Sequence, residues 1–414
     1  MIGRRPLLGA ALTAPFVARA QTASKVVVVG GGFGGGSCAR ALKAAQPSLD
    51  VMLVEASADY VACPFSNEVV AGMRELDQQR FGFDGLAKAV RLVRGVARTV
   101  DASAKTVGLA DGQSLPYDRL VLAPGIDLRF DALPGYIEAA VEKMPHAWKA
   151  GSQTTLLRDQ LRAMPDGGTV VMVVPANPYR CPPGPYERAS LIAWYLKANK
   201  PKAKLIVLDA KDAFSKQKLF EQAWAKLYPG IVERVSLSDG GKVIAVDPAA
   251  MTVQTDFDTY NAAVANVIPP QRAGAIAVAA GVADKSGWCP VDPVTFESRL
   301  VPHVHVIGDA AIMGAMPKSA FAANAQAKVC ADAIVALLAG AAPTPPILIN
   351  TCYSVAAPGY GFSVAGVYRP EKGQLTDIDG AGGASPLDAP PEQRSEEASY
   401  ADAWYETITQ QVFG

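Results

Sequence analysis

The sequence of 414 residues predicts an α/β protein with more than one parallel sheet. Three observations predict this class. Short apolar runs rich in valine recur along the chain, helix-compatible segments separate them, and a glycine-rich turn joins the first run to the first helix. Parallel strands buried on both faces have continuous apolar runs of this kind. At roughly 150 residues per domain, the length suggests two or three domains.

The composition excludes several broad classes of protein. Hydrophobic residues make up 50% of the chain, and 39 basic side chains balance 39 acidic ones. Balanced charge argues against nucleic-acid binding as the main function, because such proteins carry a basic excess. The apolar content excludes disorder. Six cysteines are too few for a disulfide scaffold, so each must be judged by its context.

Residues 1–20 predict an export signal that the mature protein lacks. Arg4 and Arg5 precede an apolar run, Pro6–Val17, and Ala18–Ala20 is an A-x-A cleavage signature. The run is shorter than the about 20 residues that span a bilayer. The paired arginines favour the twin-arginine route, with an ordinary secretory leader as the alternative. We expect a periplasmic protein with no transmembrane segment.

The predicted elements begin with a strand at Val26–Val29, the glycine turn and a helix over Ser37–Ala45. The next strand, Asp50–Val54, ends at Glu55. Apolar runs predict further buried strands at Leu120–Leu122, Thr169–Val174, Leu205–Leu208 and Val304–Ile307. Periodic segments predict helices at Thr154–Ala163, Tyr186–Ala198 and Ser319–Leu338.

The chain after Pro343 does not continue this alternation of strands and helices. Residues 371–397 are rich in glycine, proline and acids, which predicts a loop. An apolar stripe at helical spacing follows, made of Tyr400, Trp404, Ile408 and Val412. We expect this stripe to dock on the body of the protein, with membrane contact as the alternative.

Gly30, Gly32 and Gly35 form a G-x-G-x-x-G pattern between the first strand and its helix. In a dinucleotide-binding turn the first glycine allows the tight turn and the second lets a pyrophosphate approach the backbone. The third permits close packing of helix and strand. Glu55, at the end of the next strand, supplies an acidic partner for ribose hydroxyls. The segment therefore predicts a pair of phosphates at a helix N-terminus.

Two later segments resemble the remaining signatures of two-dinucleotide-binding flavoproteins. Leu120–Gly125 matches the strand and turn that return the chain to the first domain. His305–Asp309 matches the strand-Gly-Asp whose carboxylate binds the flavin ribityl chain. Taken alone, Asp309 could instead be a helix N-cap. Three motifs in order predict FAD and a glutathione-reductase-like fold.

This fold divides the chain into three predicted parts. The FAD-binding domain is discontinuous, with residues 24–150 and 268–342, and residues 151–267 form a second Rossmann-like domain. Residues 343–414 form a C-terminal interface domain. The turn of the second domain, residues 175–187, has several prolines and one glycine, which cannot form the anion cradle of a pyrophosphate. NAD(P)H is therefore not the expected reductant.

The six cysteines fall into two groups. Cys38 and Cys330 lie in predicted helices, where small buried cysteines are common, and Cys289 is ambiguous. The other three, in predicted loops beside proline, aromatic or turn residues, are Cys63, Cys181 and Cys352. Arg180 precedes one of them, and a neighbouring cation favours a thiolate and exchange chemistry. An inert, partly buried thiol is the alternative at each position.

Several segments resemble the flavoprotein subunit of flavocytochrome c sulfide dehydrogenase and the related flavoproteins of bacterial sulfur-oxidation clusters. The resemblance runs from about residue 25 to the C-terminus. The segments are YVACPFSNEV at 60–69, PHAWKAG at 145–151, RCPPGPYERAS at 180–190, VIPPQRAG at 267–274, residues 287–298, MPKS at 316–319 and NTCYS at 350–354.

The resemblance implies roles for individual residues. Cys63 would hold the 8α-methyl group of FAD as a thioether, although the Pro64-Phe65 pair after it departs from the usual aromatic-aliphatic pair. Cys181 and Cys352 would form a redox-active disulfide over the flavin, and Glu187 would transfer protons. These three are the predicted catalytic residues.

The predicted cofactor-binding residues are Gly30, Gly32, Gly35, Glu55, Cys63, Ala97, Gly125, Asp309 and Lys318, and no metal site is predicted. Lys318 would join a helix N-terminus in stabilising negative charge on the reduced flavin. A solvated surface lysine is the alternative.

The activity that the resemblance implies is oxidation of sulfide to sulfur or polysulfide by an exported FAD enzyme. The chain has no C-x-x-C-H motif, so the acceptor haem is expected on a separate cytochrome c subunit. A quinone-linked sulfide oxidoreductase is one alternative, but the acidic segment before the stripe suits a membrane poorly. The other is an auxiliary flavoprotein that resets the cysteine of a sulfur-carrier complex.

Overall fold

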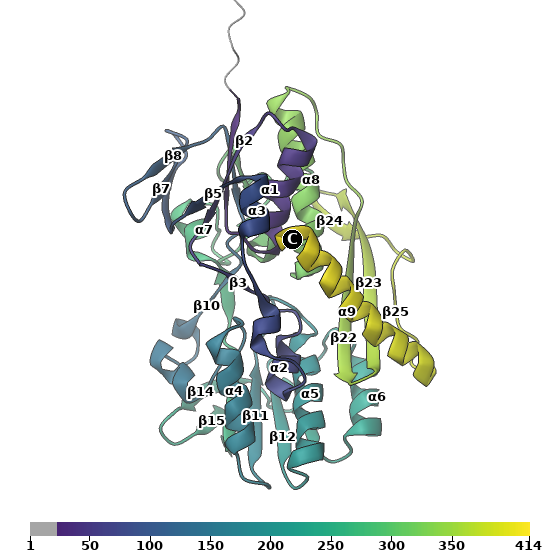
Figure 1. Ribbon diagram of the computed structural model, residues 1–414. Coiled ribbons are helices and arrows are strands. Elements are labelled where there is room, and N and C mark those ends of the chain that lie inside the picture. The colour runs from purple at the N-terminus through teal and green to yellow at the C-terminus, as the bar shows by residue number, and fades with distance from the viewer. Residues whose placement is uncertain (1–22) are drawn as a thin grey trace, which may run out of the picture.

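The computed structural model of the protein describes residues 23–414 (Figure 1). The predicted export signal at residues 1–20 lies outside the described residues. The predicted α/β class is confirmed, because two parallel sheets with helices packed on them form the two lobes of the molecule. A C-terminal hairpin and a long helix lie along both lobes, on the right in Figure 1.

The first parallel sheet has the strand order β20-β9-β1-β2-β5. In that order the strands are Val304–Val306, Arg119–Leu122, Lys25–Val29, Asp50–Glu55 and Arg91–Arg94. The valines of β1 are buried, as expected for the central strand of a covered parallel sheet. Helix α1 (Phe33–Ala45) begins four residues before the predicted helix, directly after the glycine turn.

Helix α8 (Ala320–Leu338) packs against α1. Cys330 of α8 and Cys38 of α1 are both fully buried. Within residues 23–414, α8 is the one helix whose length and apolar composition would allow it to cross a membrane. Its N-cap is Ser319, whose hydroxyl accepts the N–H of Ala322, so the predicted helix begins one residue too early.

The second parallel sheet has the strand order β13-β12-β11-β17. In that order the strands are Val232–Val235, Lys204–Asp209, Thr169–Val174 and Val264–Val267. Its helices are α4 (Ser152–Ala163), α5 (Gly184–Asn199) and α6 (Gln217–Leu227). Every strand and helix predicted in this region is present, with bounds that differ by two residues or fewer.

Smaller elements connect and extend the two sheets. Antiparallel strands β10 (Ile126–Leu128) and β18 (Gln271–Ala273) pair where the chain leaves and re-enters the first lobe. The others are β3 (Tyr60–Val61), α2 (Ser66–Ala71), β4 (Arg80–Phe81), α3 (Asp84–Ala89), β6 (Ala97–Asp101), β7 (Thr106–Leu109), β8 (Ser114–Pro116), β14 (Val243–Asp247), β15 (Thr252–Thr255), β16 (Thr259–Asn261), α7 (Ala275–Ala279), β19 (Cys289–Pro290) and β21 (Ala311–Ile312).

The C-terminal region corrects the prediction of a loop at residues 371–397. Strands β22 (Leu348–Ala357) and β23 (Tyr360–Glu371) form a long hairpin, to which β24 (Gln374–Asp377) and β25 (Gly383–Ala384) are added. Helix α9 then begins at Pro391, inside the predicted loop, and ends at Phe413. Proline is well tolerated in the first turn of a helix, so the proline-rich segment begins a helix here.

The apolar stripe of α9 docks on the body of the protein as expected, but on a different set of residues. Tyr400 is 54% exposed, whereas the buried face carries Ala401, Tyr405, Ile408 and Val412. With 3.6 residues per turn, steps of four residues drift by about 40° each, so an unbroken i, i+4 series leaves its own face. Mixed steps of four and three keep the face aligned.

Candidate functional site

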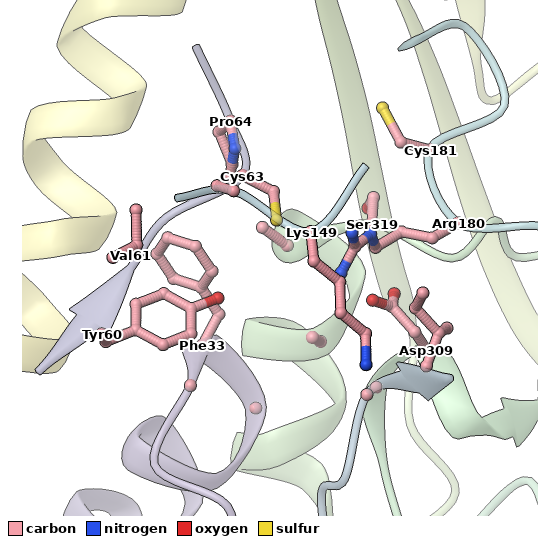
Figure 2. Close-up of a pocket in the computed structure, with 18 of the residues that line it drawn as sticks. Phe33, Tyr60, Val61, Cys63, Pro64, Lys149, Arg180, Cys181, Asp309 and Ser319 are labelled. Atoms are coloured by element: carbon pink, nitrogen blue, oxygen red, sulfur yellow. The ribbon is translucent and has the colours of Figure 1, made fainter. Parts of the chain in front are cut away.

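A cavity of about 590 Å³ lies where the first lobe meets the second lobe and the C-terminal hairpin. Segments far apart in the sequence form its wall, chiefly residues 29–34, 60–68, 180–188 and 351–355. Figure 2 shows Phe33 and Tyr60 on one side of the cavity, Arg180 and Asp309 on the opposite side, and Cys63 between them.

The glycine turn after β1 forms one end of the cavity. Gly30 has a φ of +100°, and a Cβ atom there would lie 2.4 Å from the Ala123 carbonyl oxygen. A Cβ atom at Gly35 would lie 1.8 Å from the Gly30 carbonyl oxygen, which is the close helix–strand packing that the pattern predicts. Gly30 and Gly32 line the cavity, and the turn presents backbone N–H groups and a helix N-terminus to a ligand.

Two carboxylates stand at the carboxyl ends of two strands of the first sheet, Glu55 at the end of β2 and Asp309 just beyond β20. Glu55 Oε2 accepts the Gly31 N–H (2.6 Å). Asp309 lies in a 3-10 turn, Gly308–Ala310, whose N-cap is Ile307, so the N-cap interpretation of Asp309 is wrong. Its Oδ1 is buried without a hydrogen-bond partner among residues 23–414, and burial raises its pKa. A buried acceptor without a donor indicates that a ligand completes the site.

These features fit FAD. The glycine turn suits the pyrophosphate, Glu55 suits ribose hydroxyls, and the unpartnered Asp309 oxygen suits a hydroxyl of the ribityl chain. Cys63, Ala97 and Gly125 also line the cavity. By contrast, residues 23–414 contain no group of three His, Cys, Asp or Glu side chains that could hold a metal ion.

Cys63 lies in the turn between β3 and α2, and its Sγ is 3.8 Å from the Trp148 carbonyl oxygen. The Arg180 guanidinium donates to the same carbonyl. Phe65 has a φ of +65°, and its ring packs on Tyr405 of α9 with ring centres 4.9 Å apart. Phe65 therefore adopts a left-handed conformation directly after the Cys63-Pro64 pair, and its ring packs against α9.

Cys181 lies in the loop before α5 with a φ of +57°, and its N–H donates to the Lys318 carbonyl oxygen (2.8 Å). A Cβ atom at Gly184 would lie 2.9 Å from both Cys181 Sγ and the Trp148 ring. Gly184 therefore leaves the space that the sulfur occupies. Burial, followed by the charge of Glu187, raises the pKa of Cys181 to about 12.

Cys352 lies in strand β22, so the prediction of a loop cysteine is wrong at this position. Its Sγ accepts a hydrogen bond from Asn350 Nδ2 (3.2 Å), and Asn350 Oδ1 accepts from the Ser319 hydroxyl (2.6 Å). Cys181 and Cys352 both line the cavity. All six cysteines are free thiols in the structure, so the disulfide stays a prediction.

Glu187 lies in the first turn of α5, and donors hold both of its carboxylate oxygens. Oε1 accepts the Val355 N–H (2.9 Å), and Oε2 accepts from Asn67 Nδ2 (2.7 Å). Asn67 Oδ1 in turn accepts from Nε of Arg188 (2.9 Å), which is 1% exposed. Because a guanidinium can only donate, Arg188 fixes the amide orientation that presents Nδ2 to Glu187. Burial raises the pKa of Glu187, and the hydrogen bonds from Val355 and Asn67 lower it by a smaller amount.

Lys318 lies outside the lining of the cavity. Its Nζ donates to the carbonyl oxygens of Asp309 (2.8 Å) and Ala311 (2.7 Å) and lies 4.0 Å from the centre of the Trp288 ring. Burial lowers its pKa to about 8. The ammonium is therefore held by backbone carbonyls beside the Asp309 turn rather than solvated at the surface.

Family models cover most of the described chain. The model of the central part of the sulfide dehydrogenase (flavocytochrome c) flavoprotein chain matches residues 154–269, and the flavin-binding model of flavocytochrome c sulphide dehydrogenase matches residues 344–413. A pyridine nucleotide-disulphide oxidoreductase model matches residues 24–171. The flavocytochrome c sulfide dehydrogenase flavoprotein chain of Chlorobaculum thiosulfatiphilum is 58% identical over 45 residues, which cover 11% of this chain and 94% of that sequence.

The chain belongs to the flavoprotein chains of flavocytochrome c sulfide dehydrogenase.

More distant relatives share the fold of this flavoprotein chain. The mitochondrial sulfide:quinone oxidoreductase of Mus musculus is 25% identical over 308 residues, 69% of this chain and 65% of that protein. The structure of the sulfide:quinone oxidoreductase of Aquifex aeolicus has a TM-score of 0.71 at 18% identity, covering 94% of this chain and 92% of that one. Putidaredoxin reductase has a TM-score of 0.66 at 18% identity, covering 94% of each chain. The predicted two-domain FAD-dependent oxidoreductase fold is thereby confirmed.

The second lobe of this flavoprotein chain differs from the first at the place where a nicotinamide cofactor would bind. Asp209 ends β12 beside β11, as Glu55 ends β2 beside β1. Its fully buried carboxylate is paired with Lys211 (2.6 Å) and Arg234 (2.9 Å) and accepts the Tyr186 hydroxyl (2.8 Å). An acid with these partners is not available to ribose hydroxyls, which agrees with the expectation that NAD(P)H is not the reductant.

Sequence reasoning missed several residues of the flavoprotein site. Asn67, Trp148 and Asn350 lie inside the segments that carry the family resemblance, so that resemblance could have indicated them. Lys216 lies in none of those segments, and its neighbours in the sequence, AFSKQKLF at 213–220, resemble an ordinary helix start. Its place beside Cys352 is visible only in the tertiary structure.

Proposed function

We propose that this protein oxidises sulfide to sulfur or polysulfide through a Cys181–Cys352 disulfide and bound FAD, and passes the electrons to a cytochrome c partner. One observation carries the proposal. Cys181, Glu187 and Cys352 come from a loop, a helix and a strand and line the same cavity as the glycine turn and Asp309. Membership of the sulfide dehydrogenase family supports the choice of substrate.

In the proposed first step, hydrosulfide attacks one sulfur of the disulfide and the S–S bond breaks. One cysteine becomes a persulfide and the other leaves as a thiolate, so the charge of hydrosulfide passes to the leaving sulfur. Bound FAD supplies a two-electron acceptor that can return electrons singly to a haem. Glu187, whose pKa burial raises, would take the proton of the bound sulfur species, and its place in the lining of the cavity supports this role.

The proposal is tested by adding sulfide anaerobically to the oxidised holoenzyme and recording the visible flavin spectrum. We expect bleaching in the wild-type protein and its loss in Cys181→Ser and Cys352→Ser. Cys289→Ser is the matched control, because Cys289 is buried in β19 and does not line the cavity. A wild-type spectrum that sulfide leaves unchanged, with the disulfide intact by mass, would refute the proposal.

We infer that Cys63 carries FAD as a thioether, since Cys63 lines the cavity and lies between Tyr60 and Arg180 (Figure 2). Mass spectrometry of the flavin peptide tests this link. In Cys63→Ser, acid precipitation should release the flavin, whereas in the wild-type protein the flavin should stay with the precipitated chain. Flavin release from the wild-type protein would refute the link.

We propose a cytochrome c subunit rather than a quinone as the acceptor. The support is that the apolar face of α9 packs into the protein body, on α1 and β23, instead of facing outward. Sulfide-dependent reduction of cytochrome c and of a soluble ubiquinone analogue should be compared. Faster reduction of the quinone would favour a sulfide:quinone oxidoreductase. If neither acceptor is reduced and addition of this protein restores the activity of a sulfur-carrier protein, the auxiliary function would be favoured.

We also propose that the protein is periplasmic and exported by the twin-arginine route, on the strength of Arg4 and Arg5 in the sequence. Cell fractionation tests this location. Replacement of both arginines by lysine should retain the protein, with its cofactor, in the cytoplasm, and continued export of that variant would refute the route.

A further inference from the structure

Lys216 is a partly buried cation beside the reactive sulfur pair that the proposed function does not use. It precedes α6 in a left-handed conformation, with a φ of +61°. Its Nζ donates to the Cys352 carbonyl oxygen (2.8 Å) and to the Ser354 hydroxyl (2.6 Å). The two hydrogen bonds hold β22 at Cys352 and two residues beyond it.

Two aromatic rings also lie close to the Lys216 ammonium. The rings of Phe220 and Phe362 lie with their centres 5.9 and 5.5 Å from Nζ. Burial lowers the pKa of Lys216 to about 8, and the negative charges of Cys352, Glu187 and Cys181 oppose that effect. An ammonium has three N–H donors, and residues 23–414 supply acceptors for two of them.

We propose that Lys216 is a positioning residue for the sulfur chemistry: it clamps β22 at Cys352 and supplies the positive charge that stabilises the thiolate released there when the disulfide opens. The proposal rests on the proposed function, because a thiolate forms at this place only if Cys352 is redox-active. The charge of Cys352 is the largest of those that raise the pKa of Lys216, so the two groups interact electrostatically as well as through the backbone. A nearby opposite charge typically shifts a pKa by about 1–3 units towards the charged form.

Other ionisable groups face the same cysteines and act in different directions. Glu187 of α5 and Glu397 of α9 bring negative charge, and Tyr368 of β23 lies close enough to interact with Cys352. Arg180 and Arg188 are further cations near Cys181, but the Arg180 guanidinium is bonded to the Trp148 carbonyl beside Cys63 and that of Arg188 to Asn67. Lys216 is the cation that bonds the backbone of Cys352 itself, so its removal should affect this thiol most directly.

The test measures thiol ionisation without sulfide or an acceptor. The holoenzyme is reduced, freed of reductant under argon and alkylated with iodoacetamide between pH 5 and 10. Mass spectrometry then gives the alkylation rates of the Cys352 and Cys181 peptides. The midpoint is the pH at which the alkylation rate of a cysteine is half its maximum. In Lys216→Met the midpoint of Cys352 should rise by about 1 pH unit or more, which makes alkylation of Cys352 roughly tenfold slower at pH 7.

Lys216→Arg keeps the charge and should leave the midpoint near that of the wild-type protein. Lys218→Met is the matched control, since Lys218 lies two residues away on α6 and is exposed. If Lys216→Met does not fold with its cofactor, Lys216→Gln serves in its place with the same expectation. An unchanged Cys352 midpoint in the neutral variant, or an equal rise in Lys216→Arg, would overturn the proposal.

The outcome is separable from that of the proposed function. A shifted alkylation midpoint in a protein that sulfide fails to bleach supports the role of Lys216 and refutes sulfide as the substrate. Bleaching by sulfide together with an unshifted alkylation midpoint supports sulfide as the substrate and refutes the role of Lys216.

Discussion

The rate of flavin reduction by sulfide should fall at low pH as Glu187 becomes protonated, and we call this fall the acidic limb of the pH–rate profile. Replacement of Asn67 by leucine should shift this limb to higher pH. Asn67 donates to Glu187 Oε2 over 2.7 Å and accepts from Arg188 Nε over 2.9 Å. The substitution removes a donor that stabilises the ionised form of Glu187. Its pKa, which burial already raises, must therefore rise further.

The size of this shift follows from the lost hydrogen bond. A hydrogen bond to a charged group contributes about 1.5–3 kcal/mol, and one pKa unit corresponds to about 1.4 kcal/mol. The Val355 N–H still donates to the other carboxylate oxygen. We expect the limb to move upward by about 1–2 pH units, and Glu187→Gln to abolish it.

Asn266→Leu is the matched control for this experiment. Asn266 Oδ1 also accepts from Arg188 (3.1 Å) and is fully buried, but its Nδ2 donates to the backbone of Pro145 and His146. This variant should lose stability without moving the limb. The assay is stopped-flow flavin reduction between pH 4 and 9. A limb that stays in place in Asn67→Leu, or that moves equally in both variants, would refute the reasoning.

Three further predictions concern packing, the buried ion pairs and the cofactor. Gly184→Ala should crowd Cys181, because the added Cβ would lie 2.9 Å from its Sγ. Flavin reduction by sulfide should become about tenfold slower or more while the cofactor is retained, and an unchanged rate would contradict this prediction. Asp209→Asn leaves two buried cations without their anion and should lower the free energy of unfolding by about 3–5 kcal/mol in a denaturant titration; a loss below about 1 kcal/mol contradicts it. Asp309→Ala should purify with less flavin per chain by absorbance, and full occupancy would show that its unpartnered oxygen does not bind FAD.

Much of the fold could be predicted because its signals are local. Val26–Val29 and Thr169–Val174 are apolar runs that only the interior of a parallel sheet can bury, and both strands are present. The hairpin of β22 and β23 was missed, because its strands are only partly buried and show no clean apolar pattern. The start of α9 was missed because prolines and acids, which are also typical of loops, suit the first turn of a helix.

The residues of the candidate site also fall into those that local motifs predict and those that they do not. The glycine turn, Glu55 and Asp309 are set by short motifs whose geometry depends on neighbouring residues, so the sequence predicts them individually. The family resemblance added Cys63, Cys181, Cys352 and Glu187.

The sequence by itself determined the α/β class, the position of the dinucleotide turn and the cysteines that belong to the resemblance. Only the tertiary structure decided that Asn67 holds the carboxylate of Glu187 and that Lys216 bonds the backbone of Cys352. The physical reason is the separation in sequence of the residues that interact. Strand, turn and helix signals arise between residues a few positions apart, whereas these contacts join residues far apart in the sequence that meet only when the two lobes and the C-terminal hairpin pack together.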